Sequence, residues 1–333
     1  MVKKTIIIAE IGPNHNGKID LAKKLIIAAK KSNADYVKFQ TYNTSEVVIR
    51  KAKKANYQRK NTGSSENQYN MLKKLEFSRK QFLILYKFCK KNKVKFLTTA
   101  FDIQSLLFIR KLNLDYYKIP SGEINNLPYL RLIGSFKKKI ILSTGMSYLH
   151  EINKAVKILV SSGTLKRNIT LLQCNTEYPT PYIDANLKVM NIYKKNLKMN
   201  FGYSDHTLGI EASLAAVALG AKIIEKHFTL SRKLKGPDHI ASLEPKEFFF
   251  MTKSIRNIEL ALGNEKKFPT LSEKKNIKVA RKSIVASCYI KKNELFSEKN
   301  ITLKRPGDGK SPMLWDKIIG LKAKKNYKID EKI

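Results

Sequence analysis

The sequence predicts an α/β protein: a (β/α)8 TIM barrel followed by a small, mainly β C-terminal domain. Eight short apolar segments rich in Ile, Val, Phe and Tyr alternate with stretches of helical periodicity, within the roughly 250 residues that such a barrel needs. After the first of these segments the sequence reads IGPNHNG. An open doubly wound sheet would normally carry a GxGxxG phosphate turn there, so the barrel is the better prediction.

The predicted strands are short and apolar on both faces, as expected of parallel strands that are buried from both sides. They lie at residues 5–10, 36–40, 94–99, 116–120, 139–144, 169–174, 200–204 and 221–227. Amphipathic helices are expected at residues 21–31, 79–91, 103–111, 149–161, 187–194 and 208–219, with a closing helix at 245–262. One long loop is expected at residues 41–69.

The same patterns divide the chain into two domains and a connection. The barrel is expected at residues 1–263, and the polar, basic stretch NEKKFPTLSEKKN at residues 264–276 is typical of a linker. Residues 277–333 show short strand patterns around turns, with a brief helix near residues 313–319. A domain of this size has a small core and gains stability by packing on something larger.

Composition favours a cytoplasmic enzyme over a membrane protein or a nucleic-acid-binding protein. The 333 residues are 43% hydrophobic, but no run of about 18 apolar residues predicts a membrane span. The basic and then apolar N-terminus reaches Glu10 without a small-residue cleavage site, which favours a first strand over a signal peptide. Three widely spaced cysteines fit a reducing compartment. The net charge of +38 comes from lysines spread from Lys3 to Lys332, so no single basic patch predicts a nucleic-acid site.

Polar and ionisable residues stand at the end of every predicted strand, while the strand interiors are apolar. In a barrel of this kind the active site lies at the carboxyl ends of the strands. Burying such groups costs several kcal/mol each unless a ligand or a partner satisfies them. Strand by strand they are Glu10, Asn14 and His15; Lys38 and Gln40; Thr98 and Thr99; Lys118, Ser121 and Glu123; Ser143 and Thr144; Asn175, Thr176, Glu177 and Tyr178; Ser204, Asp205 and His206; and His227.

Two histidines predict a metal site. His206 and His227 follow neighbouring strands, whose ends lie about 5 Å apart in a closed barrel, so both imidazoles can reach one ion. Two neutral imidazoles with open positions suit a divalent transition metal that also binds substrate oxygens. Asp205 is expected to orient a ligand or to contact bound water beside the metal.

Two lysines inside apolar strands predict an anionic substrate. Lys38 in YVKFQ and Lys118 in YYKIP, together with Thr99, Ser121 and Ser143, are typical of a cradle for a phosphate and a carboxylate. An inward lysine can also form a Schiff base with a carbonyl substrate. The residues alone therefore leave a Schiff-base aldolase open as an alternative.

Nine ordered motifs resemble those of bacterial N-acetylneuraminate (sialic acid) synthases, and they span essentially the whole chain. They are EIGPNHNG, VKFQT, YKIPSGE, ILSTGM, CNTEYPTP, GYSDHT, EKHFT, GPDHIASLEP and KRPGDG. The resemblance implies a barrel with a C-terminal SAF domain, like type III antifreeze protein. It also implies a domain-swapped homodimer, in which each small domain covers the barrel of its partner.

The resemblance implies a role for each matching residue. The metal ligands fall on His206 and His227, and Mn²⁺ is the expected ion, with Mg²⁺ or Co²⁺ as alternatives. Phosphoenolpyruvate would be held by Lys38, Thr99, Lys118, Ser121 and Ser143, with Gln40, Thr176 and Ser204 as neighbours. The N-acylated amino-sugar aldehyde would contact Glu10, Tyr178, Asp238 and Arg305, the arginine coming from the other subunit. Two positions depart from the family pattern: Gln173 replaces a usual histidine, and Ala100 replaces a proline.

The implied reaction is a metal-dependent condensation of phosphoenolpyruvate with the sugar aldehyde, with phosphate leaving by C–O cleavage. We expect Glu123 to act as base for the attacking water and Glu10 to hold sugar hydroxyls, although the two assignments could be interchanged. His227 is expected to serve catalysis through the metal. The motif CNTEYPTP and the KNTG stretch at residues 60–63 favour N-acetylmannosamine as acceptor. Legionaminate synthases, which take a 2,4-diacetamido trideoxy sugar, share nearly all these motifs and are the alternative.

Overall fold

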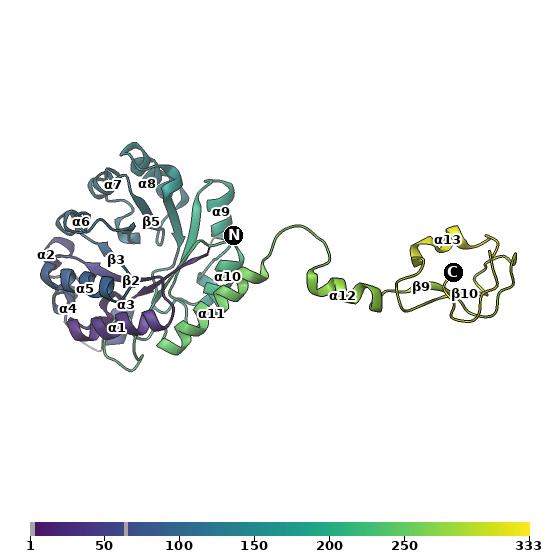
Figure 1. Cartoon of the computed structure of the whole chain (residues 1–333). Helices are drawn as coiled ribbons and strands as arrows, with labels where there is room; N and C mark the ends of the chain where they lie inside the picture. The colour runs from purple at the N-terminus through teal and green to yellow at the C-terminus, as the bar shows by residue number, and fades with distance from the viewer. Residues whose placement is uncertain (1–3, 63–65) are drawn as a thin grey trace. The chain divides into compact units, whose positions relative to one another are not determined.

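The computed structural model describes residues 4–62 and 66–333 and divides the chain into two compact units, Met1–Gly263 and Asn264–Ile333. The first unit is a closed barrel of eight parallel strands in chain order, with helices on its outside (Figure 1). This confirms the (β/α)8 prediction. No helix in the described part of the chain is long and apolar enough to cross a membrane.

The strands lie where the apolar segments predicted them, within two residues at each end. They are β1 Ile6–Glu10, β2 Tyr36–Thr41, β3 Lys95–Ala100, β4 Tyr116–Ile119, β5 Lys139–Ser143, β6 Ile169–Gln173, β7 Asn200–Asp205 and β8 Ile223–His227. The barrel closes through β1 and β8, where Glu10 pairs with His227, while Glu10 also pairs with Lys38 of β2. The register therefore places these three residues at one level of the barrel.

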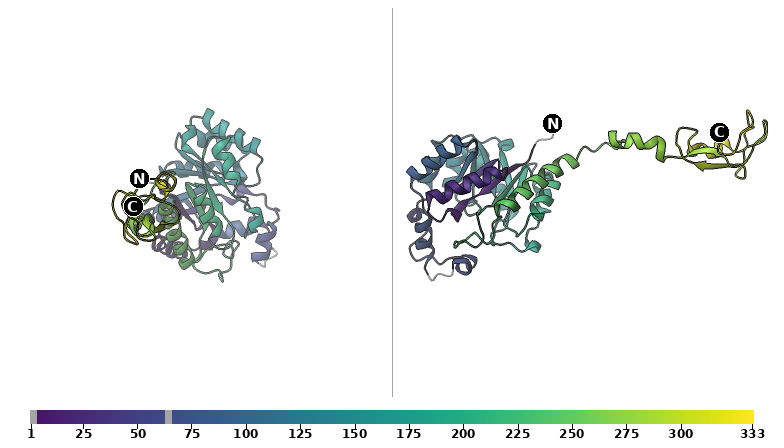
Figure 2. Two further views of the ribbon diagram at one scale, coloured as in Figure 1. Left: turned by 90° about the vertical axis from the view of Figure 1, so that its right-hand side faces the viewer. Right: turned by 60° about the horizontal axis from the view of Figure 1, so that its bottom comes forward.

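The outer helices bury one face each against the strands. They are α1 Ile19–Lys31, α5 Arg79–Lys91, α6 Ile103–Arg110, α7 Leu127–Gly134, α8 Leu149–Ser161, α9 Val189–Lys195, α10 Glu211–Ala218 and α11 Pro245–Ala261. Their ends are fixed by side chains: Ser78 and Gln81 form a capping box at α5, and Asp102 caps α6. Helices α1 and α11 lie side by side outside the barrel (Figures 1 and 2).

Two apolar clusters stabilise the barrel unit. The larger one lies between strands and helices and contains residues such as Phe39, Leu85 and Phe248. The smaller one fills the inside of the barrel and consists of Ile8, Tyr36, Leu97, Ile141, Leu172 and Ile223, all at most 4% exposed. This inner cluster forms an apolar floor that separates the two ends of the barrel.

The segment predicted as one long loop contains helical structure, so that prediction is wrong. Helices α2 Thr44–Val47 and α3 Asn56–Thr62 lie within it, and α4 Gln68–Leu75 begins there. The three helices follow β2, and we call residues 44–75 the β2 insert. These helices are short and polar, and α3 buries no residue, so their periodicity is too weak to predict a helix. The short helix α7 was also missed.

The second unit has a small core of its own around an antiparallel pair of strands. Strand β9, Ser283–Ala286, pairs with β10, Ile301–Lys304, and helix α13, Trp315–Ile318, lies near the expected short helix. The buried residues of this core are Ile284, Ala286, Ile290, Phe296, Ile301, Ile318, Ala323, Tyr327 and Ile333. The stretch predicted as a linker is partly helical, because α12 spans Leu271–Ala280 and is capped by Thr270 and Glu273.

Candidate active site

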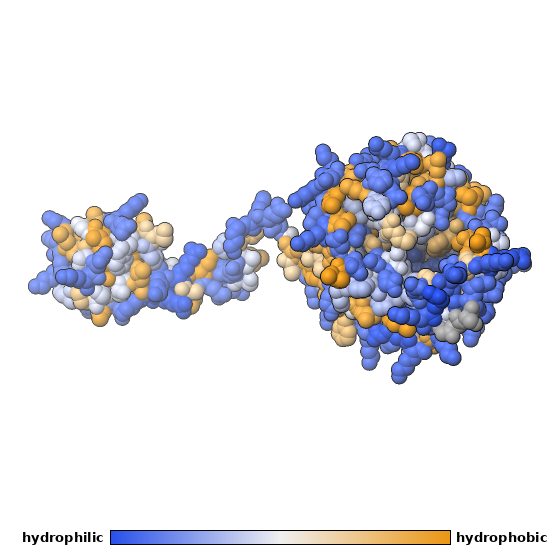
Figure 3. All heavy atoms as spheres, turned by 180° about the vertical axis from the view of Figure 1, so that it is seen from behind, coloured by the Kyte–Doolittle hydropathy of each residue, from blue (hydrophilic) through white to orange (hydrophobic). Residues whose placement is uncertain are grey.

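Polar side chains converge on the opening of the barrel at the carboxyl ends of the strands. Successive strand residues point inward and outward in turn, and the inward residues here are buried except for the half-buried Gln40. They are Glu10, Lys38, Gln40, Thr99, Lys118, Ser143, Ser204, Glu225 and His227. Seen from behind the view of Figure 1, the barrel unit is hollowed near its centre, with hydrophobic and hydrophilic residues around the hollow (Figure 3).

Two lysines and two glutamates form an ionic cluster in this opening. Lys38 Nζ lies 2.6 Å from Glu10 Oε2 and 3.6 Å from Glu225 Oε1. It also donates a 3.2 Å hydrogen bond to Thr99 Oγ1. Lys118 Nζ donates a 3.2 Å hydrogen bond to the same oxygen of Glu225. Glu225 thus lies between the two lysines, whereas of these two lysines Glu10 contacts Lys38.

The charges of this cluster shift the pKa values of its members in different directions. Burial acts to raise the pKa of Glu225, but Lys118 and Lys38 together lower it to about 2. Burial raises the pKa of Glu10, because Lys38 alone does not offset it and Glu225 adds repulsion. Burial also lowers the pKa of Lys118, whereas two carboxylates raise that of Lys38 against the effect of its burial. The site therefore places the Nζ atoms of two buried lysines beside one carboxylate oxygen, an arrangement that suits recognition of a small anion.

Gly12 lies directly over the ends of β1 and β2. Its φ is +38°, and a Cβ at this position would lie 2.5 Å from Glu10 Oε1 and 2.9 Å from Gln40 Nε2. Gln40 Nε2 donates a 3.0 Å hydrogen bond to the same Glu10 oxygen. Only glycine lets the loop after β1 approach these two side chains this closely.

His206 and His227 face each other across the ends of β7 and β8. Their ring centroids are 5.3 Å apart and the rings are tilted by 69°. Burial lowers the pKa of His206 to about 4 and that of His227 well below its usual value, so both rings are neutral at pH 7. His206 Nδ1 lies 2.5 Å from the carbonyl oxygen of Asn175, which can only accept, so this nitrogen carries the proton and Nε2 carries a lone pair, 3.4 Å from the hydroxyl oxygen of Ser204.

These residues fit a divalent metal ion. His227 Nδ1 is buried and has no hydrogen-bond partner among the described residues, which is costly for a protein alone and natural for a metal ligand. Within the described ranges, no third His, Cys, Asp or Glu side chain joins the two histidines to form a group of three around an ion. The two imidazoles would therefore leave several positions for water and substrate oxygens.

Asp238 and Tyr178 border the histidines. Asp238 Oδ2 lies 3.5 Å from His227 Nδ1, and burial, followed by the charge of Glu10, raises the pKa of Asp238 to about 7. Because His227 is neutral, this contact is not an ion pair. The ring of Tyr178 lies over that of His206, with centroids 4.1 Å apart, and meets His227 edge-on at 5.4 Å. The structure thus brings two of the four residues predicted to contact the sugar next to the histidines.

Small polar groups form a cradle at the ends of β4, β5 and β6. The backbone N–H of Gly145 donates a 3.0 Å hydrogen bond to Ser121 Oγ, which also lies 3.3 Å from Cys174 Sγ. A Cβ on Gly145 would lie 2.9 Å from both Ser121 Oγ and Thr176 Cγ2. Ser143 is buried at the end of β5, next to this cradle in sequence. Backbone N–H and hydroxyl groups of this kind suit a phosphate or a carboxylate.

Glu123 and Arg305 do not take part in this cluster of contacts. Glu123 is half buried, its Oε2 accepts a 2.6 Å hydrogen bond from Asn126 Nδ2, and burial raises its pKa. Arg305 belongs to the C-terminal unit, where it is exposed directly after β10. The catalytic role of Glu123 and the sugar contact of Arg305 stay predictions.

Several residues expected at the opening face elsewhere. Asp205 points into the layer between strands and helices, where it pairs with Lys226 at 3.0 Å and accepts a 2.6 Å hydrogen bond from Ser213 of α10. The expectation that Asp205 assists the metal is therefore wrong. Thr144 bonds outward to Tyr193, and His15 stacks on Phe77 at 4.0 Å in the core.

The two departures from the family pattern have structural roles. Gln173 donates a 3.2 Å hydrogen bond to the carbonyl of Ala185 and accepts one from Tyr193 at the same distance. The carbonyl of Ala100 accepts a 2.8 Å hydrogen bond from the hydroxyl of Tyr129. Both residues thus support the outer layer of the barrel.

Glu225 is the site residue that sequence reasoning missed. It stands two positions before His227 in EKHFT, and residues two apart share one face of a strand. Strand alternation could have placed it inside the barrel beside His227, with Lys226 on the outside. Its second oxygen, Oε2, is buried and has no hydrogen-bond partner among the described residues.

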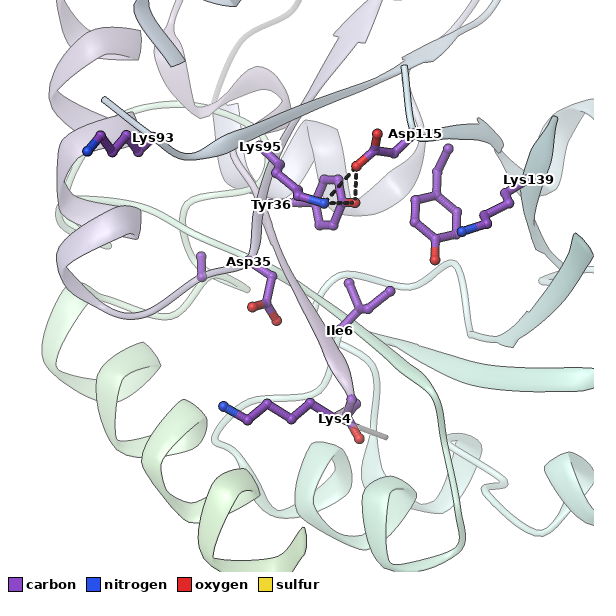
Figure 4. A pocket seen from close by; sticks show the side chains of 11 residues that line it. Lys4, Ile6, Asp35, Tyr36, Lys93, Lys95, Asp115 and Lys139 are labelled. Carbon is purple, nitrogen blue, oxygen red and sulfur yellow. Dashed lines mark hydrogen bonds and ion pairs between the residues drawn. The ribbon is translucent and has the colours of Figure 1, made fainter. Parts of the chain in front are cut away.

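A second hollow of about 580 Å³ lies at the amino ends of the strands (Figure 4). Its acidic groups are already paired. Asp115 accepts 2.8 Å hydrogen bonds from Tyr36 and Lys95, and Asp35 lies 3.1 Å from the guanidinium of Arg256. Residues at this end of a barrel serve stability rather than catalysis. The candidate active site is therefore the opening at the carboxyl ends.

Known proteins share this architecture over nearly the whole chain. An N,N'-diacetyllegionaminic acid synthase of Campylobacter jejuni is 52% identical over 332 residues, which cover 100% of this chain and 99% of that protein. The same enzyme of Legionella pneumophila is 41% identical, covering 96% of this chain and 90% of that protein. A crystal structure of N-acetylneuraminic acid synthetase from Leptospira borgpetersenii matches with a TM-score of 0.72 and 35% identity, covering 82% of this chain and 90% of that one.

Two family models match successive parts of the chain. Residues 25–267 match the NeuB family, and residues 281–333 match the SAF domain. The first match contains both histidines and the ionic cluster except Glu10, which lies just before it. The protein therefore belongs to the NeuB family and carries a C-terminal SAF domain.

Proposed function

We propose that this enzyme joins phosphoenolpyruvate to a 2,4-diacetamido trideoxy sugar aldehyde, giving a legionaminate-type nonulosonate and phosphate. The observation that carries the proposal is the pairing, in one barrel opening, of two buried lysines with two neutral imidazoles. The sequence favoured N-acetylmannosamine as acceptor. The identity of 52% to a legionaminic acid synthase favours the diacetamido sugar instead.

Phosphoenolpyruvate supplies the anionic groups that the lysines and the cradle can bind. Lys38 and Lys118 already converge on Glu225 Oε1, within 3.6 Å, so their ammonium groups are close enough to share one anionic substrate. Ser121 and Thr176 would bind the remaining oxygens, with Thr99, Ser143, Gln40 and Ser204 as neighbours. Holding two reactants in this way removes much of the entropic cost of a bimolecular reaction.

A divalent ion, most simply Mn²⁺ with Mg²⁺ or Co²⁺ as alternatives, fits His206 Nε2 and His227 and would polarise the aldehyde carbonyl when bound. Asp238 and Tyr178 border this place and would orient the sugar. The alkene carbon of phosphoenolpyruvate attacks the carbonyl carbon, water adds to the resulting cationic carbon, and phosphate departs with the bridging oxygen.

Two carboxyl groups are candidates for moving the proton of the water. Burial raises the pKa of Glu123, which makes its carboxylate a stronger base, and Asn126 holds it in place. Glu10 is engaged by Lys38 and Gln40, which suits a group that holds sugar hydroxyls. We further propose a domain-swapped homodimer, in which Arg305 reaches the sugar in the barrel of the other subunit, and a cytoplasmic location.

The test is an assay of the purified protein with phosphoenolpyruvate labelled with ¹⁸O in its bridging position, Mn²⁺ and either acceptor. We expect phosphate that carries the label, and a higher kcat/KM with the diacetamido sugar than with N-acetylmannosamine. Unlabelled phosphate would refute C–O cleavage. Borohydride trapping of pyruvate on a lysine would instead support a Schiff-base aldolase.

A further inference from the structure

A cavity of about 260 Å³ leads from His227 to the β2 insert. At one end it is lined by His227, Asp238 and Gln40, which belong to the candidate active site. At the other end its lining is mostly apolar and includes Tyr42, Val47, Met71, Leu72, Leu75 and Phe101, with Gln58 and Gln68 as the polar residues of the insert beside them. One cavity thus joins a polar reaction centre to an apolar wall.

The apolar wall is built from the insert and is held in place by it. Met71 and Leu75 are 4% and 8% exposed, and both lie on the buried face of α4. Helix α4 is tied to its neighbours, because Glu76, just after it, accepts hydrogen bonds from the backbone and the hydroxyl of Thr44, at 3.0 and 2.6 Å. The hydroxyl of Tyr42 donates a 3.1 Å hydrogen bond to the carbonyl of Leu72.

A second set of contacts joins the insert to the reaction centre. The rings of Tyr57 of α3 and Tyr178 are 4.9 Å apart, and Tyr178 itself covers His206. Asn61 Nδ2 donates a 2.6 Å hydrogen bond to the carbonyl of Pro237, next to Asp238. The wall therefore has a fixed position relative to the place where the aldehyde is expected.

The lining decides which acceptor this cavity favours. A sugar whose aldehyde lies at His227 must extend its other end toward Met71, Leu72 and Leu75. Hydroxyl groups placed against these three side chains would lose hydrogen bonds to water that the side chains cannot replace, whereas methyl groups would gain contact with the wall. N-acetylmannosamine ends in hydroxyls, while the diacetamido trideoxy sugar ends in a methyl group and carries a second acyl methyl.

We propose that the wall formed by Val47, Met71, Leu72 and Leu75 binds the methyl-bearing end of the acceptor and selects a deoxy, acylated sugar over a polyhydroxylated one. The inference rests on the proposed function, since it assigns acceptor selection to this wall of the same site. One methyl group in a hydrophobic pocket changes kcat/KM by roughly 10- to 200-fold. The wall should therefore account for a preference of at least tenfold.

The experiment compares kcat/KM for the two acceptors in the full-length protein with Mn²⁺ and saturating phosphoenolpyruvate. Leu72→Gln and Met71→Gln place an amide in the wall. Leu132→Gln is the matched control, because Leu132 is a half-buried leucine of α7 outside the site. Thermal unfolding of each variant establishes that it is folded at the assay temperature.

We expect the wild type and Leu132→Gln to prefer the diacetamido sugar. Both wall variants should lose at least tenfold of that preference, while their KM for phosphoenolpyruvate stays unchanged. A preference that survives in both folded wall variants would overturn the inference and leave the proposed function intact. A wild type that prefers N-acetylmannosamine would overturn both the inference and the acceptor named in the proposed function. A wild type that uses neither sugar would refute the proposed function itself.

Discussion

Replacing Glu225 by glutamine tests the electrostatic description of the active site. The carboxylate lies 3.2 Å from Lys118 Nζ and 3.6 Å from Lys38 Nζ, and these cations outweigh burial and lower its pKa from 4.5 to about 2. The difference of about 2.5 between these values corresponds to roughly 3 kcal/mol of stability, at about 1.4 kcal/mol per pKa unit. Breaking a buried ion pair by removing one partner costs a similar amount, about 3–5 kcal/mol.

The pH dependence of this contribution has a definite sign. Because the folded-state pKa of Glu225 is lower than the unfolded one, the contribution is fully present above about pH 4.5 and is lost as the pH falls toward about 2. Glu225→Gln should therefore be less stable than the wild type by about 3 kcal/mol at pH 7, and the difference should shrink in acid.

Urea unfolding followed by far-UV circular dichroism is the appropriate assay. The only tryptophan, Trp315, lies in the C-terminal unit, so its fluorescence reports on that unit and not on the barrel. Glu265→Gln, at an exposed position outside the barrel unit, is the control and should leave the free energy of unfolding unchanged. A Glu225→Gln protein as stable as the wild type at pH 7 would refute the reasoning.

Three further predictions concern Asp238, His227 and the exchange of C-terminal domains. Asp238→Asn should stabilise the metal-free protein by about 4 kcal/mol at pH 8, because burial raises the pKa of Asp238 from 3.8 to about 7 and its ionised form destabilises the fold. Urea unfolding should show the difference vanishing below about pH 4, and equal stabilities at pH 8 would contradict it. His227→Ala should lose bound Mn²⁺, measured by elemental analysis, and be inactive. Mixing it with Arg305→Ala should restore activity if subunits exchange C-terminal domains, whereas a mixture that stays inactive would argue against the swap.

The barrel was predictable because its strands carry a strong local signal. A strand such as Ile169–Gln173 is apolar on both faces and could hardly be anything but a buried parallel strand. The strand ends were equally informative, because Lys38 and Lys118 are costly to bury without a function. Both lysines and both histidines indeed meet in one opening.

Two kinds of feature could not be predicted from the sequence: the side of a strand to which a side chain points, and structure that tertiary contacts stabilise. Asp205 and His206 are neighbours in sequence, yet they point to opposite sides of the strand, so polarity at a strand end does not by itself place a residue in the site. The helices of the β2 insert are short and are stabilised by tertiary contacts such as those of Glu76 with Thr44. The sequence therefore shows no clear helical periodicity there. The apolar wall of the cavity beside His227 could not be predicted for the same reason, because the insert forms it.

The apolar floor inside the barrel also determines from which end of the barrel substrates can reach the active site. The floor fills the interior of the barrel, and none of its side chains is more than 4% exposed. They are Ile8, Tyr36, Leu97, Ile141, Leu172 and Ile223. Among the described residues, this cluster separates the reaction centre from the hollow at the amino ends. For the proposed reaction, both reactants would therefore enter, and both products would leave, at the carboxyl ends of the strands.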